Sequence, residues 1–424
     1  MAKTLSYRDA VVLLGGDPPA VVALDRALGG ALSLATGGAS DTALSIFDAQ
    51  GRIIGLGRDL VLGLRDRLRG ARRVDRTRCL EAANSVIVVT SYFEALADAP
   101  LPMAVSELRL TRQDQLKLAG VSAQGEEFLD ALLGLAPPGP SPHLPYERFL
   151  EALRQWYGLL SSRLVSFASG LAVWDRLDDT GRAQAERIFT VEVCDEAVSR
   201  FSELYSRLSR DFPEFGFWSG QIEHQATRAE IRRALADVES LLASVSPGWP
   251  PVDIAAALSD AYRAALARPI LAEGEAPAGI RLPTLEEGYL DPDFRVRPVA
   301  DGDVPADETW WAGIPVRSDL TEYLAGVLTS PEATSAPVVV LGQPGAGKSV
   351  LTKVLAARLP AGDFLPVRVV LRETPAEANI QDQVEYAIRV ATGERMDWPQ
   401  VTRAASGAVP VVCRRSCNSP ALRG

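Results

Sequence analysis

The stretch APVVVLGQPGAGKSVLTKVLAARLP, residues 336–360, constrains the fold of this 424-residue chain more than any other segment. It begins with an apolar, mostly β-branched run, which predicts a β-strand over 338–341. A glycine-rich loop follows, and an amphipathic run then predicts a helix over 349–359 that Pro360 ends. Between a strand and a helix, a glycine that is followed after four residues by Gly-Lys-Ser is typical of a phosphate-binding loop (Gly342, Gly347, Lys348 and Ser349).

The chemistry of phosphate binding explains this composition. Glycines let the backbone wrap closely around a polyphosphate and point N–H groups inward, and the positive end of the following helix adds to that field. We expect Lys348 to reach the β- and γ-phosphates and the Ser349 hydroxyl to ligate Mg²⁺. The predicted cofactors are therefore ATP and Mg²⁺, and the predicted nucleotide-binding residues are Gly342, Gln343, Pro344, Gly345, Ala346, Gly347, Lys348, Ser349 and Val350.

Alternating strand and helix patterns follow the loop. The runs DFLPVRVVLR (363–372) and AVPVVC (408–413) predict strands, and IQDQVEYAIRVATG (380–393) predicts a helix between them. Together with the first strand they form a βαβαβ pattern, which implies parallel strands joined by crossover helices.

The first 247 residues contain helical patterns instead. Apolar residues recur at steps of three and four in two long stretches, which predicts amphipathic helices with buried stripes. The predicted stripes are Phe149, Leu153, Trp156, Leu160, Leu164 and Phe167, then Ile188, Val191, Cys194, Val198, Phe201 and Leu204. A further helix carries Ile231, Leu235, Val238 and Leu242 on one side, and earlier candidates lie at 19–35, 57–68 and 75–97.

Residues 248–335 are predicted to be a connector. VDIAAALSDAYRAALA (252–267) predicts a short helix, and DETWWAGIPVRSDLTEYLAGVL (307–328) predicts an ordered linker followed by another helix. We expect Trp310 and Trp311 to be buried against one of the domains. The predicted fold class is an all-α N-terminal domain over 1–247, this connector over 248–335, and an incomplete α/β P-loop unit with parallel strands over 336–424.

The composition limits the class of partner. A net charge of −10 and a pI near 5.0 argue against a general nucleic-acid-binding surface. We find no apolar run long enough for a transmembrane segment and no signal-peptide pattern at the start, so we expect a cytoplasmic protein. Arginine far outnumbers lysine, and Ala, Gly and Pro are abundant, which indicates a GC-rich bacterial genome.

Other chemistry-bearing residues give weaker signals. Cys413 and Cys417 are spaced like half of a metal site, but no second Cys or His pair accompanies them. His143 and His224 have no visible nucleophile partner, so both are interpreted as surface or packing residues. The arginine-rich segment 65–78 could touch anionic lipid or nucleic acid, although a solvated helix end is the favoured interpretation in an acidic chain.

Taken together, VVVLGQPGAGKSVLTKVLAARL, FLPVRVVLRE, IQDQVEYAIRVATGE and WPQVTRAASGAVPVV resemble the first half of a bacterial NACHT module, of the STAND class of signalling NTPases. LPTLEEGYLDPDFRV and WWAGIPVRSDLTEYL resemble the connectors that lead into such modules, and the helical segment resembles N-terminal domains of actinobacterial NACHT proteins. The resemblance implies an ATP-controlled switch in which an effector or adaptor, an NTPase and a sensor are joined. It also implies a link to defence against phage.

One departure from the family concerns hydrolysis. An NTPase needs acidic residues at the end of a further strand, to hold the Mg²⁺ shell and to activate water. In the family the strand at 408–413 continues into an aspartate-rich segment, whereas here Arg414 and Arg415 follow, and no Asp or Glu occurs after Asp397. We expect no hydrolysis, and we hypothesise that 414–424 is a disordered or out-of-frame tail of a truncated gene product.

The sheet order of the family has a further consequence. There the strand corresponding to 338–341 lies beside strands that come later in the chain, so here it should lack at least one neighbour. Its backbone groups would then stay exposed. We therefore expect the segment from about residue 330 onward to be marginally stable and to bind ATP weakly.

Two functions from different classes remain open. The first is an ATP-binding signalling protein of the NACHT/STAND switch type, which self-associates through its NTPase or its helical domain. The second is a helical effector or interaction protein with a vestigial nucleotide-binding unit. A small-molecule P-loop kinase would need a base and a lid after the loop, and neither is visible in the sequence.

Overall fold

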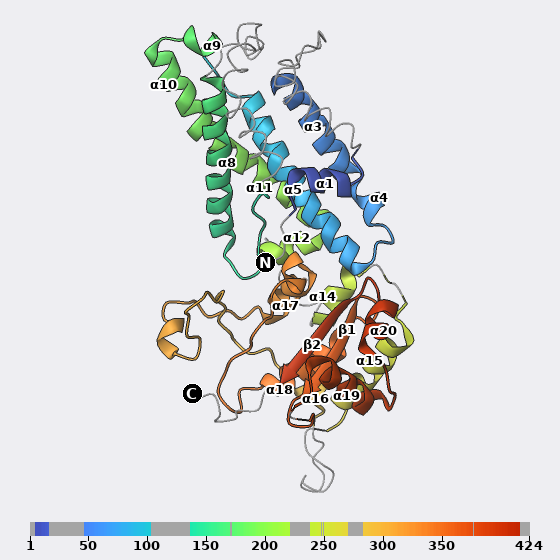
Figure 1. Ribbon diagram of the computed structural model, residues 1–424. Coiled ribbons are helices and arrows are strands. Elements are labelled where there is room, and N and C mark those ends of the chain that lie inside the picture. Colours follow the sequence, from blue (N-terminus) through green and yellow to red (C-terminus); the bar gives the residue numbers. More distant parts are fainter. Residues whose placement is uncertain are drawn as a thin grey trace. The chain divides into compact units, whose positions relative to one another are not determined.

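The computed structural model forms two compact units, and Figure 1 shows both. Unit 1 comprises Met1–Arg69 and Thr77–Gln221, and unit 2 comprises Gly70–Arg76 and Ile222–Gly424. The residues that the structure describes are 5–16, 46–102, 136–169, 172–220, 238–246, 248, 250–269, 283–375 and 377–415. Predictions for 19–35, Ile231, Leu235, His224, Cys417 and residues 416–424 of the predicted tail lie outside these residues. The prediction of a disordered tail was wrong for Arg414 and Arg415, because these two residues end a paired strand.

Helices make up every described element of unit 1, whereas unit 2 combines helices with two strands. The elements that lie wholly in unit 1 are α1 (Tyr7–Leu13), α3 (Ile46–Leu62), α4 (Leu64–Leu68), α8 (Tyr146–Ala168), α9 (Ala172–Asp175), α10 (Asp179–Arg187), the π-helical turn η4 (Ile188–Glu192), α11 (Val193–Asp211) and α12 (Pro213–Ser219). Helix α5 (Arg73–Ala97) begins in unit 2 and continues in unit 1. The elements of unit 2 are α14 (Val238–Ser244), α15 (Asp253–Leu266), α16 (Leu285–Gly288), η5 (Glu308–Trp311), α17 (Leu320–Thr329), η6 (Pro331–Thr334), α18 (Lys348–Arg358), β1 (Phe364–Val370), α19 (Ile380–Thr392), α20 (Trp398–Ala404) and β2 (Val409–Arg415).

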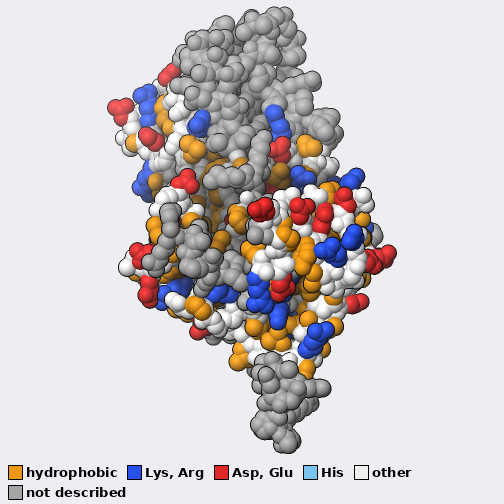
Figure 2. Space-filling model, turned by 60° about the horizontal axis from the view of Figure 1, so that its bottom comes forward, with side chains coloured by type: hydrophobic (Ala, Val, Ile, Leu, Met, Phe, Trp, Pro, Cys, Tyr) orange, Lys and Arg blue, Asp and Glu red, His pale blue; other side chains and the backbone are white. Residues whose placement is uncertain are grey.

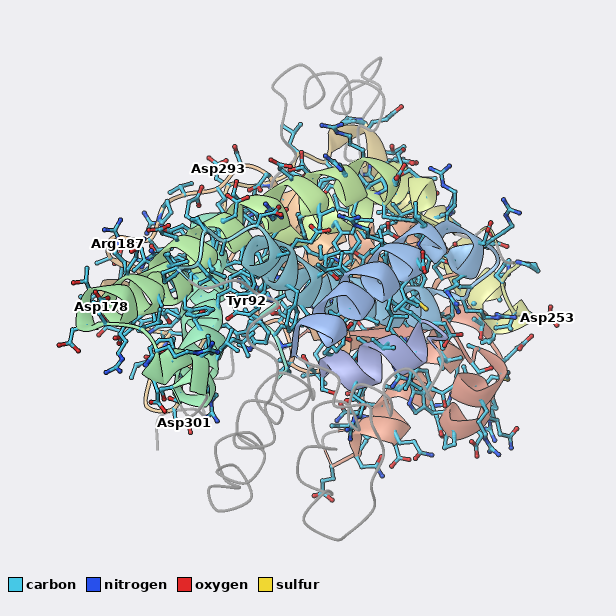
Figure 3. The ribbon with its side chains drawn as sticks, turned by 90° about the horizontal axis from the view of Figure 1, so that it is seen from above. Tyr92, Asp178, Arg187, Asp253, Asp293 and Asp301 are labelled. Carbon is cyan, nitrogen blue, oxygen red and sulfur yellow. The ribbon has the colours of Figure 1, made fainter. Side chains whose placement is uncertain are left out.

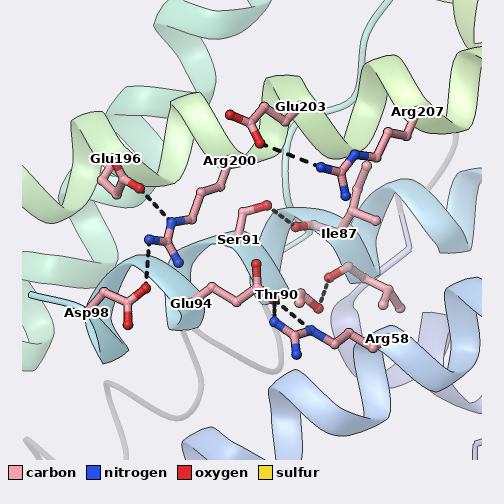
Figure 4. Close-up of polar contacts among 11 residues, drawn as sticks. Arg58, Ile87, Thr90, Ser91, Glu94, Asp98, Glu196, Arg200, Glu203 and Arg207 are labelled. Atoms are coloured by element: carbon pink, nitrogen blue, oxygen red, sulfur yellow. Dashed lines mark hydrogen bonds and ion pairs between the residues drawn. The ribbon is translucent and has the colours of Figure 1, made fainter.

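Helix α5 carries much of the core of unit 1. It buries an unbroken run of side chains from Ala82 to Phe93, because neighbouring segments cover it on several sides. Helix α3 approaches so closely that a Cβ on Gly57 would lie only 2.0 Å from Thr90 Oγ1. The buried hydroxyls of Thr90 and Ser91 donate to carbonyls one turn earlier, so they remain hydrogen-bonded in an apolar setting (Figure 4).

Helices α8 and α11 confirm most of the predicted stripes. Phe149, Leu153, Leu160 and Leu164 are buried on α8, and Ile188, Cys194 and Phe201 are buried on η4 and α11. The prediction for Val191 was wrong, because its side chain is 42% exposed. The π-helical turn η4 is the reason, since it adds a residue to the helical repeat and rotates the following turns.

Ion pairs surround this helical core. Arg58 of α3 pairs with Glu94 of α5 at 2.7 Å, and Arg200 of α11 bonds both Glu196 and Asp98 (Figure 4). Side chains cover the helices on all sides, and Figure 3 labels Asp178 and Arg187, which lie at the two ends of α10. Asp178 caps α10 by accepting a hydrogen bond from Gly181 N at 2.7 Å. We expect the exposed ion pairs to contribute little to the stability of unit 1.

The core of unit 2 is built on a two-stranded sheet. Strands β1 and β2 are parallel, and Phe364 lies opposite Val409 and Val370 opposite Arg415. The predicted strands at 363–372 and 408–413 and their parallel direction are therefore confirmed. The crossover includes the predicted helix α19 and also α20, a helix that was not predicted.

Helix α15 joins this core although it precedes the phosphate-loop motif in the chain. Ile254, Ala255 and Leu258 of α15 belong to one buried cluster with residues of β1, α19 and α20, including Leu365, Val367, Val369, Val384, Ile388 and Val401. The sequence pattern gives α15 correctly as a helix, but it placed the helix in the connector. The apolar face of α15 explains this position, because it covers the β1 side chains that alternate toward the helix.

The connector folds on itself at the two tryptophans. Trp310 and Trp311 lie edge to face with ring centroids 4.7 Å apart, and Arg297 stacks over Trp310. Both side chains are only half-buried, so the prediction that a domain buries them was wrong. The two indoles and the Arg297 stem instead shield each other, as amphipathic side chains do. The predicted short helix at the end of this segment is α17.

The surface of the described residues is mixed in character. In Figure 2, side chains of both charge signs are interspersed with hydrophobic ones on the described part of the face that is drawn. Among the described helices, none has the length and apolarity that a membrane crossing requires. A helical N-terminal region followed by a part with parallel strands agrees with the predicted fold class at this coarse level.

Candidate nucleotide-binding site

The glycine-rich loop, defined here as residues 342–349, lies in unit 2 immediately before and at the start of α18. Gly345 and Gly347 have φ values of 84° and 78°, in the left-handed region that glycine adopts without strain. Ala346 N donates to Gln343 O at 3.2 Å, which closes a turn between them. Two left-handed residues therefore set the path of the loop, and Gly347 is the N-cap of α18.

Lys348 begins α18 and its side chain folds back over the loop. Its Nζ donates to Gly342 O at 2.6 Å and to Gln343 O at 3.0 Å. The ammonium group thus lies against the backbone of the loop, where its positive charge adds to that of the α18 N-terminus. Because lysine is a flexible point donor, this group can exchange carbonyl oxygens for phosphate oxygens with a small rotation of the side chain.

Ser349 is fixed by the first turn of α18. Thr352 Oγ1 donates to Ser349 O at 3.0 Å, and Val350 N and Leu351 N both donate to Gly347 O. The next two side chains pack in different directions. Val350 packs against the apolar cluster of Leu266, Val354 and Ala357, and Leu351 packs against the cluster of Leu320, Tyr323 and Val327. Ser349 is therefore anchored through two apolar contacts of its neighbours.

The loop has the features that a polyphosphate requires. Its residues 342–347 are exposed, and a Cβ added at Gly345 or Gly347 would meet no atom within 4 Å. Open space above glycine backbone, next to a helix N-terminus and an ammonium group, suits an anion with several charges. The nine residues that the sequence predicts thus lie in one loop and the first turn of α18, and the loop leaves open space for a polyphosphate beside its glycines. Ser349 would hold Mg²⁺, which would neutralise the phosphate charge when it is bound.

The strand predicted before the loop is not formed. Residues 338–341 form neither helix nor strand and pair with no strand among the described residues, and their side chains are about half exposed, with Val339 at 69%. A strand needs a neighbour for its backbone hydrogen bonds, and β1 pairs with β2 instead. The prediction of a strand over 338–341 was therefore wrong, although its expected exposure agrees with the structure.

Arg368 is a residue near the loop that the sequence reasoning missed. It lies in the middle of β1, which is otherwise apolar and mostly buried, and its Nε donates to Thr352 Oγ1 at 3.2 Å. Its backbone N–H donates to the hydroxyl of Tyr262 on α15 at 3.0 Å. A single charged residue inside the run FLPVRVV was the available signal, since a buried strand rarely carries an arginine without a partner.

Other predicted candidates are not part of the loop 342–349. Cys413 lies opposite Arg368 in the sheet, and burial raises the pKa of its thiol to about 11. A thiol of this kind is a poor ligand and a poor nucleophile at neutral pH. In the described parts of the chain, no group of three or more His, Cys, Asp or Glu residues is arranged to hold a metal ion. His143 lies in the loop before α8, in unit 1.

Unit 1 contains a buried polar network of a different kind. The hydroxyls of Tyr92 on α5 and Ser161 on α8 lie 3.0 Å apart, and Ser161 Oγ lies 3.4 Å from Cys194 Sγ on α11 (Figure 3 labels Tyr92). Tyr157 OH donates to Val88 O at 2.9 Å. Burial raises the pKa values of Tyr92 and Cys194, so both groups stay protonated. The network links three helices and has the character of a structural core.

Comparison with known protein families matches residues 2–223 to NACHT N-terminal helical domain 7. Searches among curated proteins and among solved structures give no match. The matched range covers unit 1 and slightly more than half of the chain. It supports the resemblance that the sequence suggested, because this helical domain is named for its place before NACHT modules. The chain therefore belongs to the NACHT N-terminal helical domain 7 family.

Proposed function

We propose that this chain is an ATP-binding signalling protein of the NACHT/STAND switch type, in which a helical effector or adaptor domain precedes a nucleotide-binding unit. One observation carries the proposal. The glycine-rich loop has left-handed glycines at 345 and 347 and an ammonium group at the start of α18. This geometry occurs in a chain whose helical domain belongs to a NACHT-associated family.

The proposed roles follow from the donors that the loop presents. Backbone N–H groups of Gly345, Gly347, Lys348 and Ser349, at and before the α18 N-terminus, would bind the phosphates, Lys348 would supply a positive charge, and Ser349 would hold Mg²⁺. Binding, and not hydrolysis, is the proposed activity. The family resemblance adds a proposed role in bacterial defence against phage, with cytoplasmic location and nucleotide-dependent self-association.

Lys348 provides the direct test. We expect Lys348→Ala to weaken ATP binding in the presence of Mg²⁺ at least about tenfold, because a charge-assisted contact to phosphate is lost. Isothermal titration calorimetry on the full chain measures this. Lys353→Ala is the matched control, since Lys353 lies on the same helix and is exposed. Equal affinities of wild type and Lys348→Ala would contradict the proposal.

A second function is favoured by the exposed segment 338–341. If the strand before the loop stays unpaired, the loop is held only from its helical side, and unit 1 would act as an interaction module beside a vestigial nucleotide unit. In that case ATP does not raise the thermal stability of the full chain, and Lys348→Ala leaves that stability unchanged with or without ATP. Cells that express the chain with and without Lys348→Ala then show the same phage plaque counts.

A further inference from the structure

We propose that Arg368 is a positioning residue for the Mg²⁺-binding Ser349: through Thr352 it fixes the first turn of α18 and thereby sets how strongly Mg²⁺ promotes ATP binding. This inference rests on the proposed nucleotide-binding function. It assigns a role to Arg368 on strand β1, a residue that neither the loop motif nor the family match includes.

The position of Arg368 in its strand calls for a physical explanation. Strand β1 has the sequence FLPVRVV, and all of its other residues are buried. Leu365, Val367 and Val369 alternate toward the cluster that includes α15 and α19, so Arg368 lies on the opposite face of the sheet. A half-buried guanidinium in such a strand is unfavourable unless polar groups receive it.

The contacts of Arg368 lead directly to the loop. Its Nε donates to Thr352 Oγ1 at 3.2 Å, and the same hydroxyl donates to Ser349 O at 3.0 Å. The Thr352 hydroxyl therefore uses its one proton on Ser349 and accepts from the arginine, which fixes its orientation. Arg368 and Ser349 are thus joined by a single side chain, one helical turn below the proposed metal ligand.

The strand end of this connection is itself held in place. The Arg368 backbone N–H donates to Tyr262 OH at 3.0 Å, and Tyr262 packs against both the β1 cluster and the cluster that includes Val350. Strand β1 also pairs with β2 along its length. The guanidinium therefore projects from a rigid base, whereas the loop that it supports is exposed and contains two left-handed glycines.

The contact through Thr352 limits which part of ATP binding Arg368 can affect. The contact of Arg368 with this turn runs through Thr352, so we expect its loss to loosen the serine and to leave the loop N–H groups and Lys348 in place. Phosphate binding without a metal depends on those donors. Binding with Mg²⁺ additionally depends on the placement of the serine hydroxyl, because Mg²⁺ tolerates little deviation from octahedral geometry. Arg368 should therefore matter for the metal-dependent part of ATP affinity.

The test compares ATP affinity in MgCl₂ with ATP affinity in EDTA, by calorimetry on the full chain. We expect Arg368→Ala to lower the affinity in MgCl₂ about tenfold and to leave the affinity in EDTA unchanged. Thr352→Val keeps the shape of the side chain but removes both hydrogen bonds, and it should give the same result. Arg372→Ala is the control, since Arg372 follows the same strand, is exposed and pairs with Glu373.

Hydrogen exchange of the same variants without nucleotide provides a second readout. We expect faster exchange at amides 350–353 in Arg368→Ala and Thr352→Val, but not in Arg372→Ala. Unchanged exchange, or equal losses of affinity with and without Mg²⁺, would overturn the positioning role. If wild type binds no ATP at all, the proposed nucleotide function fails. The exchange rates then decide separately whether Arg368 positions this turn.

Discussion

Two short runs rich in β-branched residues differ in secondary structure and in burial. Val86-Ile87-Val88-Val89 lies within α5 and is at most 1% exposed, whereas Val338-Val339-Val340-Leu341 forms neither helix nor strand and is about half exposed. Their intrinsic preferences for β structure are similar. The difference lies in their surroundings, because segments from several helices cover the first run and no described strand pairs with the second.

The two runs show that a preference for β structure produces a strand only where the backbone finds hydrogen-bond partners. In unit 1, the helix around 86–89 satisfies its own backbone hydrogen bonds, and burial of the valines then stabilises it despite their low helix propensity. The segment 338–341 of unit 2 can satisfy its backbone only through a neighbouring strand. A helix can therefore be completed within its own segment, but a strand cannot.

The strongest test of the buried side of this comparison is a charge in the helical core. We expect Phe201→Asp to destabilise unit 1 by about 4 kcal/mol or more, because the aromatic contacts to Phe149 and Tyr205 are lost and a carboxylate is buried. Urea unfolding followed by circular dichroism measures the change. Val191→Asp, on the exposed side of the π-helical turn, should stay within about 0.5 kcal/mol. A large effect at Val191 would mean that the turn η4 is absent in solution.

A pair of valines tests the other side of the comparison within unit 2. Val367→Ala should cost about 2 kcal/mol, since Val367 is fully buried in the core around β1. Val339→Ala should change the free energy of unfolding by less than about 0.5 kcal/mol. Urea unfolding of the full chain measures both. Similar costs at both positions would show that 338–341 is paired in solution.

Periodicity predicted most of the helices and both strands, because each pattern depends on residues close in sequence. The stripes of α8 and α11, the strand β1 and the helix α19 all follow this rule. Val191 was misplaced since a π-helical turn shifts the repeat by one residue, and sequence steps of three and four carry no sign of it. The prediction that a domain buries Trp310 and Trp311 failed because the two rings pack against each other and Arg297 stacks over Trp310.

The candidate site was predictable to a similar extent. The order of Gly342, Gly347, Lys348 and Ser349 is local, and the structure brings these residues into one loop and turn. The link from Arg368 to Thr352 depends on how α18 packs against β1, which no local pattern encodes. The same holds for Tyr262, whose helix α15 was assigned to the connector and instead packs with the sheet.

The smallest expected effect concerns the polar network of unit 1. Ser161→Ala should cost about 1 kcal/mol, because it leaves the buried Tyr92 hydroxyl without its partner. The adjacent Ser162 is exposed and donates only to Gly158 O, so Ser162→Ala should be close to neutral. If the two alanine variants have the same stability by urea unfolding, the network contributes nothing to the helical core.

The pH dependence of stability tests whether the Tyr92 hydroxyl is buried. Burial raises the pKa of Tyr92 above its ordinary value of 10.0, so the native state keeps this proton at a pH where the unfolded chain loses it. The unfolded state then binds fewer protons, and stability falls as pH rises above 10. Tyr92→Phe removes this contribution, and its unfolding free energy should fall less steeply than that of wild type over the same range. Parallel curves for the two proteins would place the Tyr92 hydroxyl in water, and the contrast between a covered α5 and an uncovered 338–341 would then be weaker than the structure indicates.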